Sequence, residues 1–225
     1  MRQTLRLHLA IGLVIASVAG CGSSPAETAT APATSQPDNL PALTASFEAH
    51  LNDYLVPEWL PRPITSGQLT DVCIVSPGLA PSPCSELRDA VNGSIVVVLT
   101  DTREVAPQFL NSVAYPDRYP IAEYLHGAHV APVSFGATPD DVDTVVLVAS
   151  RESETATYSD GTKGYNTTYW VTVVNLEKKT VVGKATFLGA GPPYPAKNVP
   201  GDVHAAAPWD QLVIALSCAS DPTCD

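Results

Sequence analysis

Residues 145–188 read VVLVASRESETATYSDGTKGYNTTYWVTVVNLEKKTVVGKATFL, and this stretch decides the fold. Runs rich in Val, Thr and aromatic residues are separated by two segments of turn residues, 159–164 and 175–179. This pattern predicts three strands, over 145–158, 168–174 and 180–188. Strands joined by short turns pair antiparallel, so we predict a three-strand meander. In the last strand, alternation places Val181, Ala185 and Phe187 on one face.

The rest of the chain supplies a buried strand and several helices. Residues 95–100 are apolar at nearly every position, which is typical of a strand covered on both faces. A short strand is expected over 72–75. An apolar face of Phe47, Leu51 and Leu55 predicts a helix over 43–55, capped by Thr44 or Ser46 and ended by Pro57. Further helices are expected over 85–91, 105–113, 121–125 and 209–217. We therefore predict one α+β domain over 43–225, with a mainly antiparallel sheet, a buried strand and helices packed on one face.

The N-terminus has the pattern of an export signal. Arg2 and Arg6 precede an apolar run over 7–18, which is too short to span a bilayer, and small residues follow. Residues 18–21 read VAGC and resemble the lipobox of bacterial lipoproteins. That resemblance implies a signal peptide over 1–20, cleavage before Cys21, and palmitate-type acylation of Cys21. The alternative is an ordinary secreted protein with a cysteine near its cleavage site.

Acylation of Cys21 predicts where the protein lies. Two or three acyl chains anchor a protein to a bilayer, since each buried methylene contributes ~0.8 kcal/mol. Residues 21–42 are mostly Ser, Thr, Ala and Pro, so we expect a disordered tether that holds the domain roughly 25 Å from the membrane. The protein is therefore expected on the outer face of the cell membrane or on another envelope membrane.

Charge argues against two classes of partner. The formal net charge is −11, and removal of residues 1–20 leaves ten basic and 23 acidic side chains, a net −13. An acidic surface repels nucleic acid and anionic lipid head groups, so no nucleic-acid partner is expected. Plain solubility also explains this charge.

The cysteine count predicts disulfides. Without Cys21, four cysteines remain, and an even number in an exported chain indicates two bridges. Three pairings are possible; the short loops favour Cys73–Cys84 and Cys218–Cys224. Metal binding by these cysteines is disfavoured, because no C-x-x-C occurs.

No catalytic motif is present: G-x-S-x-G, S-x-x-K and H-E-x-x-H are all missing. His126 and His129 are weak candidates for a metal site, because Gly127 disfavours a helix between them; loop histidines are the preferred interpretation, and no cofactor is expected. A hydrolase would need scattered residues, such as Ser134 or Ser159 with His204. Glu152 and Glu154 share a strand face, as a pair of glycosidase carboxylates would.

Four tyrosines near the predicted meander suggest a ligand or partner surface: Tyr158, Tyr165, Tyr169 and Tyr194. Cross-strand packing of these rings is the simpler explanation. The segment over 143–193, with its D-G tip and G-x-G-P-P end, is similar to actinobacterial secreted proteins and lipoproteins of no assigned activity. We expect a non-catalytic envelope lipoprotein that binds an envelope protein or a small ligand, the alternative being an envelope hydrolase.

Overall fold

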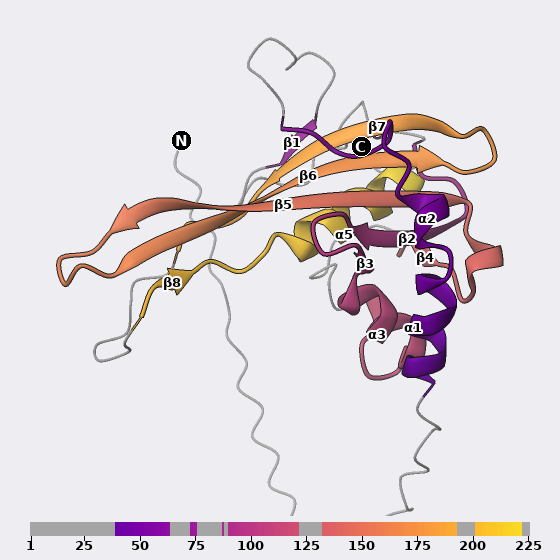
Figure 1. The fold of residues 1–225 in the computed structure, drawn as a ribbon, viewed down its shortest axis with the longest axis horizontal. Helices are drawn as coiled ribbons and strands as arrows, with labels where there is room; N and C mark the ends of the chain where they lie inside the picture. The colour runs from indigo at the N-terminus through magenta and orange to yellow at the C-terminus, as the bar shows by residue number, and fades with distance from the viewer. Residues whose placement is uncertain are drawn as a thin grey trace, which may run out of the picture. The chain divides into compact units, whose positions relative to one another are not determined.

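One mixed sheet runs through the domain. The computed structural model describes residues 39–63, 73–75, 87, 90–121, 132–192 and 201–221. Eight strands are joined in the order β1-β7-β6-β5-β2-β3, with β4 beside β2 and β8 beside β6 (Figure 1). The strands are β1 (Cys73–Val75), β2 (Ser94–Leu99), β3 (Glu104–Val105), β4 (Ser134–Phe135), β5 (Thr144–Thr157), β6 (Lys163–Asn175), β7 (Thr180–Leu188) and β8 (Val203–His204). The helices are α1 (Leu40–Glu48), α2 (Leu51–Tyr54), α3 (Pro107–Ala114), the 3-10 turn η2 (Pro139–Asp141) and α5 (Trp209–Ser220).

The strand pairing combines both directions. β5 pairs antiparallel with β6, and β6 pairs antiparallel with β7. β2 pairs in parallel with β5, from Ile95 opposite Thr144 to Leu99 opposite Val148, after a crossover through β3, α3 and β4. β1, β4 and β8 also pair in parallel with β7, β2 and β6. The α+β class is confirmed, and the sheet is mixed. The parallel pairs were not predicted, because a strand pattern in the sequence does not show which partner each strand meets.

The core forms where helices meet the inner strands. Ile95, Val96 and Val98 are fully buried, which is why β2 is apolar on both faces. Phe109 of α3 packs edge-on against Phe47 of α1, with 5.4 Å between ring centroids. It also contacts Phe135 of β4 at 4.9 Å. From α5, Leu212, Val213 and Leu216 pack into the same cluster, and α5 matches the helix predicted over 209–217.

The first helix differs from its prediction. α1 begins at Leu40, before the predicted domain start at residue 43, and α2 is a separate helix. Pro41 lies in the first helical turn, where its missing N–H is tolerated. Thr44 and Ser46 are therefore not caps: they lie inside α1, and their hydroxyls donate to Leu40 O (2.8 Å) and Leu43 O (3.1 Å).

A β-bulge overturns one predicted face. Val173 pairs with Gly183 but Val174 pairs with Val181, so Val182 is an extra residue in β7. Side-chain alternation is reversed at this point. Val181 is consequently 36% exposed and lies opposite to Ala185 and Phe187, which remain buried.

Other expected elements are found with shifted ends. β6 begins at Lys163 rather than at residue 168, and the helix expected over 105–113 is α3, preceded by β3. Thr138 caps η2, because its N–H and hydroxyl both donate to the Asp141 carboxylate at 3.0 and 2.8 Å. The helices expected over 85–91 and 121–125 lie largely outside the described residues.

Several predicted sites also lie outside these ranges. They are the signal peptide, Cys21, the tether up to residue 38, Cys84, Cys224, His126, His129 and Tyr194. Cys218 in α5 is buried and disulfide-bonded, but its partner is not among the described side chains, so the pairing stays a prediction. Within the described ranges, no helix combines the length and the apolar character needed to cross a bilayer.

Candidate functional site

The hairpin of β5 and β6 extends beyond the core. From Ser150 onward, the side chains of β5 are exposed, with the partial exception of Ala156. Here β8 replaces β7 at the edge of β6: β7 pairs with β6 from Thr168 onward, and β8 pairs with Gly164 and Tyr165. Figure 1 shows this hairpin reaching away from α1 and α3, with β8 beside it. We call residues 150–157, 163–168 and 202–204 the arm.

One face of the arm carries most of its polar contacts. Glu152 lies opposite Thr167, and Glu154 lies opposite Tyr165. Directly opposed residues project from the same face, so both carboxylates lie on the face of Tyr165. Alternation along β6 places Lys163, two residues before Tyr165, on this face too, and the bulge at Thr155 puts Thr157 opposite Lys163. We call this surface the arm face.

His204 joins the three strands of the arm. Its Nδ1 lies 2.9 Å from Glu152 Oε1, a distance at which the imidazole N–H donates to the carboxylate. The imidazole also stacks on the ring of Tyr165, with 5.0 Å between centroids and an interplanar angle of 11°. Side chains from β8, β6 and β5 are thereby held together, although Glu152 and His204 are each half exposed.

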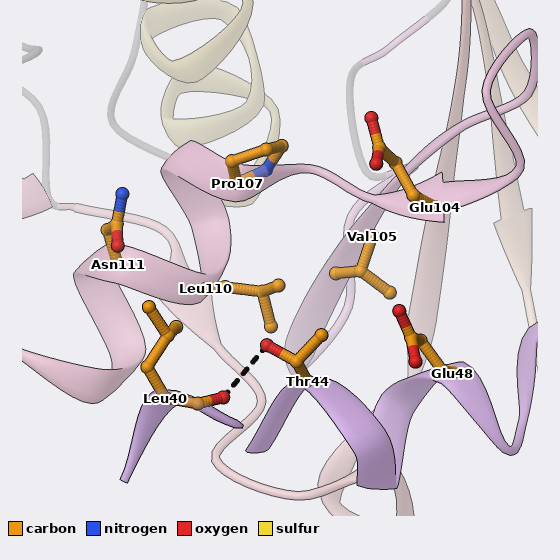
Figure 2. A pocket seen from close by; sticks show the side chains of 8 residues that line it. All are labelled: Leu40, Thr44, Glu48, Glu104, Val105, Pro107, Leu110 and Asn111. Atoms are coloured by element: carbon orange, nitrogen blue, oxygen red, sulfur yellow. Dashed lines mark hydrogen bonds between the residues drawn. The ribbon is translucent and has the colours of Figure 1, made fainter. Parts of the chain in front are cut away.

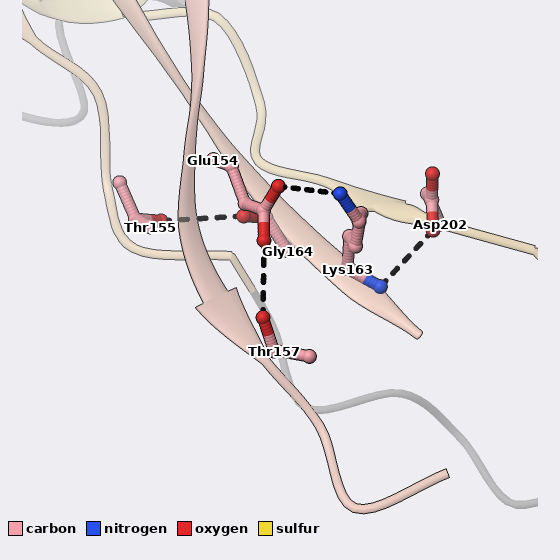
Figure 3. A network of polar contacts seen from close by, with 6 residues as sticks. All are labelled: Glu154, Thr155, Thr157, Lys163, Gly164 and Asp202. Atoms are coloured by element: carbon pink, nitrogen blue, oxygen red, sulfur yellow. Dashed lines mark hydrogen bonds and ion pairs between the residues drawn. The ribbon is translucent and has the colours of Figure 1, made fainter. Parts of the chain in front are cut away.

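A second group of contacts lies nearer the hairpin turn (Figure 3). Lys163 Nζ lies 2.7 Å from Glu154 Oε2, and the Thr157 hydroxyl donates to Glu154 Oε1 at 3.0 Å. The Lys163 N–H donates to Asp202 Oδ1 at 3.0 Å. Hydrogen bonds from Lys163 and Thr157 lower the pKa of Glu154, and the same ion pair raises the pKa of Lys163. Both groups are therefore charged at neutral pH.

The predicted tyrosines separate into two environments. Tyr165 belongs to the arm face, and Tyr158 is half-buried at its end, where its hydroxyl donates to Pro192 O at 3.5 Å. Tyr169 is 6% exposed within the core opposite Phe187, and burial raises its pKa. Its ring does not reach the surface, which corrects its assignment to a ligand surface.

The scattered hydrolase residues do not all meet. Ser134 pairs with Ser94 at the start of β2, and the start of β2 lies beside Thr144, the first residue of β5. His204 lies level with Glu154, which is ten residues further along β5. At ~3.3 Å per residue, roughly 33 Å separates the two positions along the sheet. Ser159 lies in the turn at the tip of the arm, and no hydrogen bond joins it to His204 in the described part of the chain.

The arm face therefore offers exposed proton-transfer groups, but no described serine hydroxyl forms a hydrogen bond with His204. Glu152 and Glu154 share a face, as expected, but each already contacts a cationic or imidazole partner. Metal binding gains no support from this part of the chain, since no three of its His, Cys, Asp or Glu side chains gather closely enough to hold an ion.

A pocket lies beside the edge strand β3, between α1, β3 and α3 (Figure 2). Its volume is about 230 Å³. Eight residues line it: Leu40, Thr44, Glu48, Glu104, Val105, Pro107, Leu110 and Asn111. Sequence reasoning missed this pocket, because its two halves come from separate segments, 40–48 and 104–111, and neither carries a motif.

Comparison of the chain with protein-family models, with curated proteins and with solved structures finds no match.

Proposed function

We propose that this chain is an exported, lipid-anchored protein of the cell envelope, and that its domain binds another envelope protein through the arm face. Acylation of Cys21 and a tether up to residue 38, before α1, belong to this proposal. So does the finer architecture: a meander of β5, β6 and β7, the buried strand β2 beside it, and helices on one face. The strand registers support that arrangement.

One observation carries the binding proposal. Polar contacts fix the side chains of the arm face, although the arm extends beyond the hydrophobic core. The His204–Glu152 bond, the Tyr165 stack and the Glu154–Lys163 pair fix side chains that are otherwise open to solvent. Side chains that are already fixed lose less conformational entropy when a partner binds. The arm face is therefore preorganised for recognition.

The charged residues and the bulge of β5 favour binding of a partner to the arm face over pairing of a strand with the edge of β5. Among the described residues, no strand pairs with the outer edge of β5 beyond Ser150. Arg151, Glu152 and Glu154 place charges on that edge, and a bulge follows at Thr155. These features oppose edge-to-edge pairing with another strand. A partner therefore contacts the side chains of the arm face, whose mixed charge suits a polar interface.

The binding proposal is tested by cross-linking in cells that make the protein naturally. A photo-reactive phenylalanine analogue at Tyr165 is expected to give one discrete cross-linked product. The same analogue at Ser153, on the opposite face, or at Glu177, in the far turn, is expected not to. Purified wild-type domain should compete, whereas a His204→Ala domain should compete poorly. Identical products from all three positions would refute the proposal.

The anchor is tested separately by Cys21→Ala. We expect the variant protein to be released into the medium or to remain unprocessed, and mass spectrometry of the wild-type N-terminus to show acyl chains on Cys21. Membrane retention of the variant with normal processing would contradict the anchor without affecting the arm.

The alternative is an envelope hydrolase, and the His204–Glu152 contact is the observation in its favour, because such a pair transfers protons. A screen of the purified domain against ester, peptide and glycoside substrates distinguishes the two. Turnover that is lost in both His204→Ala and Glu152→Gln would replace the binding proposal.

A further inference from the structure

The pocket between α1, β3 and α3 has an apolar floor. Val105 and Leu110 are 3% and 6% exposed, and Leu40 and Pro107 form its sides. The pocket belongs to the helical end of the domain, so it is separate from the arm (Figure 1). Apolar walls at this depth favour a ligand with an apolar body, since burial contributes roughly 25 cal/mol per Å² of apolar surface.

Two carboxylates meet at one end of this pocket. Glu48 ends α1, Glu104 begins β3, and Figure 2 shows both at the same end, on either side of Val105. No lysine or arginine is among the described residues that line the pocket, and neither carboxylate has an ion pair or hydrogen bond with any described residue. Arg103 precedes Glu104 in the sequence, but the two described side chains form no ion pair with each other. Within the described ranges, this end of the pocket therefore carries negative charge without a cationic partner.

The opposite end is polar and neutral. Asn111 places its side-chain amide there, with one donor group and one acceptor oxygen. The Thr44 hydroxyl, near the middle of the pocket, donates to Leu40 O. The pocket thus runs from a negative end, over an apolar floor, to a hydrogen-bonding end.

We propose that this pocket binds a small organic cation, with its ammonium group between Glu48 and Glu104 and its apolar body on Val105 and Leu110. A hydrated metal ion gains nothing from the apolar floor and requires more oxygen ligands than two carboxylates supply. The volume lies below the roughly 300–1,000 Å³ of pockets for drug-sized ligands, so the ligand has on the order of a dozen non-hydrogen atoms.

The neighbouring N-terminal segment does not supply this cation. Residues 22–38 precede α1 and contain neither lysine nor arginine. The pocket is therefore assigned to a free amine rather than to the protein's own tether. This inference does not depend on the arm, and it stands or falls separately from the proposed function.

Tyramine is the probe, since it has an ammonium group, an aromatic body and a hydroxyl that can form a hydrogen bond with an amide such as that of Asn111. Binding to the full-length protein is measured by titration calorimetry and ligand-observed NMR, up to about 10 mM, where sites of millimolar Kd are occupied. 4-Ethylphenol, which lacks the ammonium group, is expected to bind at least about tenfold more weakly.

The matched variant is Glu48→Gln with Glu104→Gln, which keeps the shape of the pocket and removes its charge. We expect tyramine affinity to fall at least about tenfold, while the control Glu58→Gln, an exposed acid outside the pocket, keeps it. Equal binding of tyramine and 4-ethylphenol, unchanged affinity in the double variant, or no binding of tyramine would each overturn the proposal. The comparison of the two probes uses wild-type protein, so it is decisive even where a variant unfolds.

Discussion

Substitution of Gly93 by alanine tests how β2 is fixed to β5. Gly93 precedes β2 with φ +64°, and a Cβ at this position would overlap the Asp143 carboxylate. That carboxylate accepts the Ser94 N–H at 2.9 Å, and the Asp143 N–H donates to Ser94 O at 2.8 Å. The added methyl group therefore displaces the side chain that joins the starts of the two central strands.

The expected cost has two parts. A non-glycine residue at positive φ costs about 1 kcal/mol. Displacing Asp143 removes a hydrogen bond to a charged acceptor, worth ~1.5–3 kcal/mol where buried; this bond is exposed, so about 1 kcal/mol is appropriate. We expect the free energy of unfolding to fall by about 2 kcal/mol in Gly93→Ala.

Gly161→Ala is the matched control. Gly161 has φ +86°, and a Cβ there would meet nothing within 4 Å, so only the conformational part remains, about 1 kcal/mol. Urea unfolding of protein lacking residues 1–21 measures both variants, with an unchanged m-value as the condition for comparison. In an Asp143→Ala background, the excess cost of Gly93→Ala should disappear. Equal costs for the two glycine variants in the wild-type background would refute this account.

Three further predictions concern the core, the alkaline limit and the arm. Phe109→Ala removes the ring that packs against Phe47 and Phe135 and is expected to lower the free energy of unfolding by about 3–5 kcal/mol, measured in urea; a change below 1 kcal/mol would contradict this packing. Burial, aided by nearby acidic groups, raises the pKa of Tyr54 to about 12, so the unfolded chain loses this proton first, near pH 10. The contribution of neutral Tyr54 to the free energy of unfolding is complete below pH 10 and is lost as pH rises towards 12. Tyr54→Phe should therefore flatten the plot of unfolding free energy against pH between these values. An identical plot for the variant would show that Tyr54 is not the group responsible. The pKa of Glu154 is lowered by Lys163, so the contribution of this pair is present above the pKa of an unfolded glutamate and is lost as pH falls through the lowered folded value. Glu154→Gln should remove that acid dependence from amide protection factors in the arm, with those in α5 as an internal reference.

Periodicity predicted the elements whose burial is continuous. β2, β5 and β7 have long β-branched runs, and α5 has apolar residues at helical spacing, so each was placed to within a few residues. The turn predicted over 175–179 is found over 176–179, and Asn175 Oδ1 accepts the Lys178 N–H there at 2.8 Å. Local composition is sufficient for such features because local contacts determine them.

Features that depend on distant partners could not be predicted. β3, β4 and β8 have two residues each, too few for a period, and they exist because a neighbouring strand pairs with them. The bulge at Val182 adds one residue without changing composition, yet it moves Val181 to the other face. The arm face was seen only as scattered residues, because the pairing of His204 with Tyr165 spans residues far apart in the chain.

The parallel pairing of β2 with β5 has a consequence for how the chain matures. Ser94 and Asp143 are 49 residues apart, so β2 has no partner for one side until β5 has been synthesised and delivered. Pairing over such a separation is slow. A chain threaded through a membrane from its N-terminus would therefore remain unfolded during passage, which is the state that translocation requires. In a chain exported as proposed above, this order of strands would delay folding until β5 has reached the far side of the membrane.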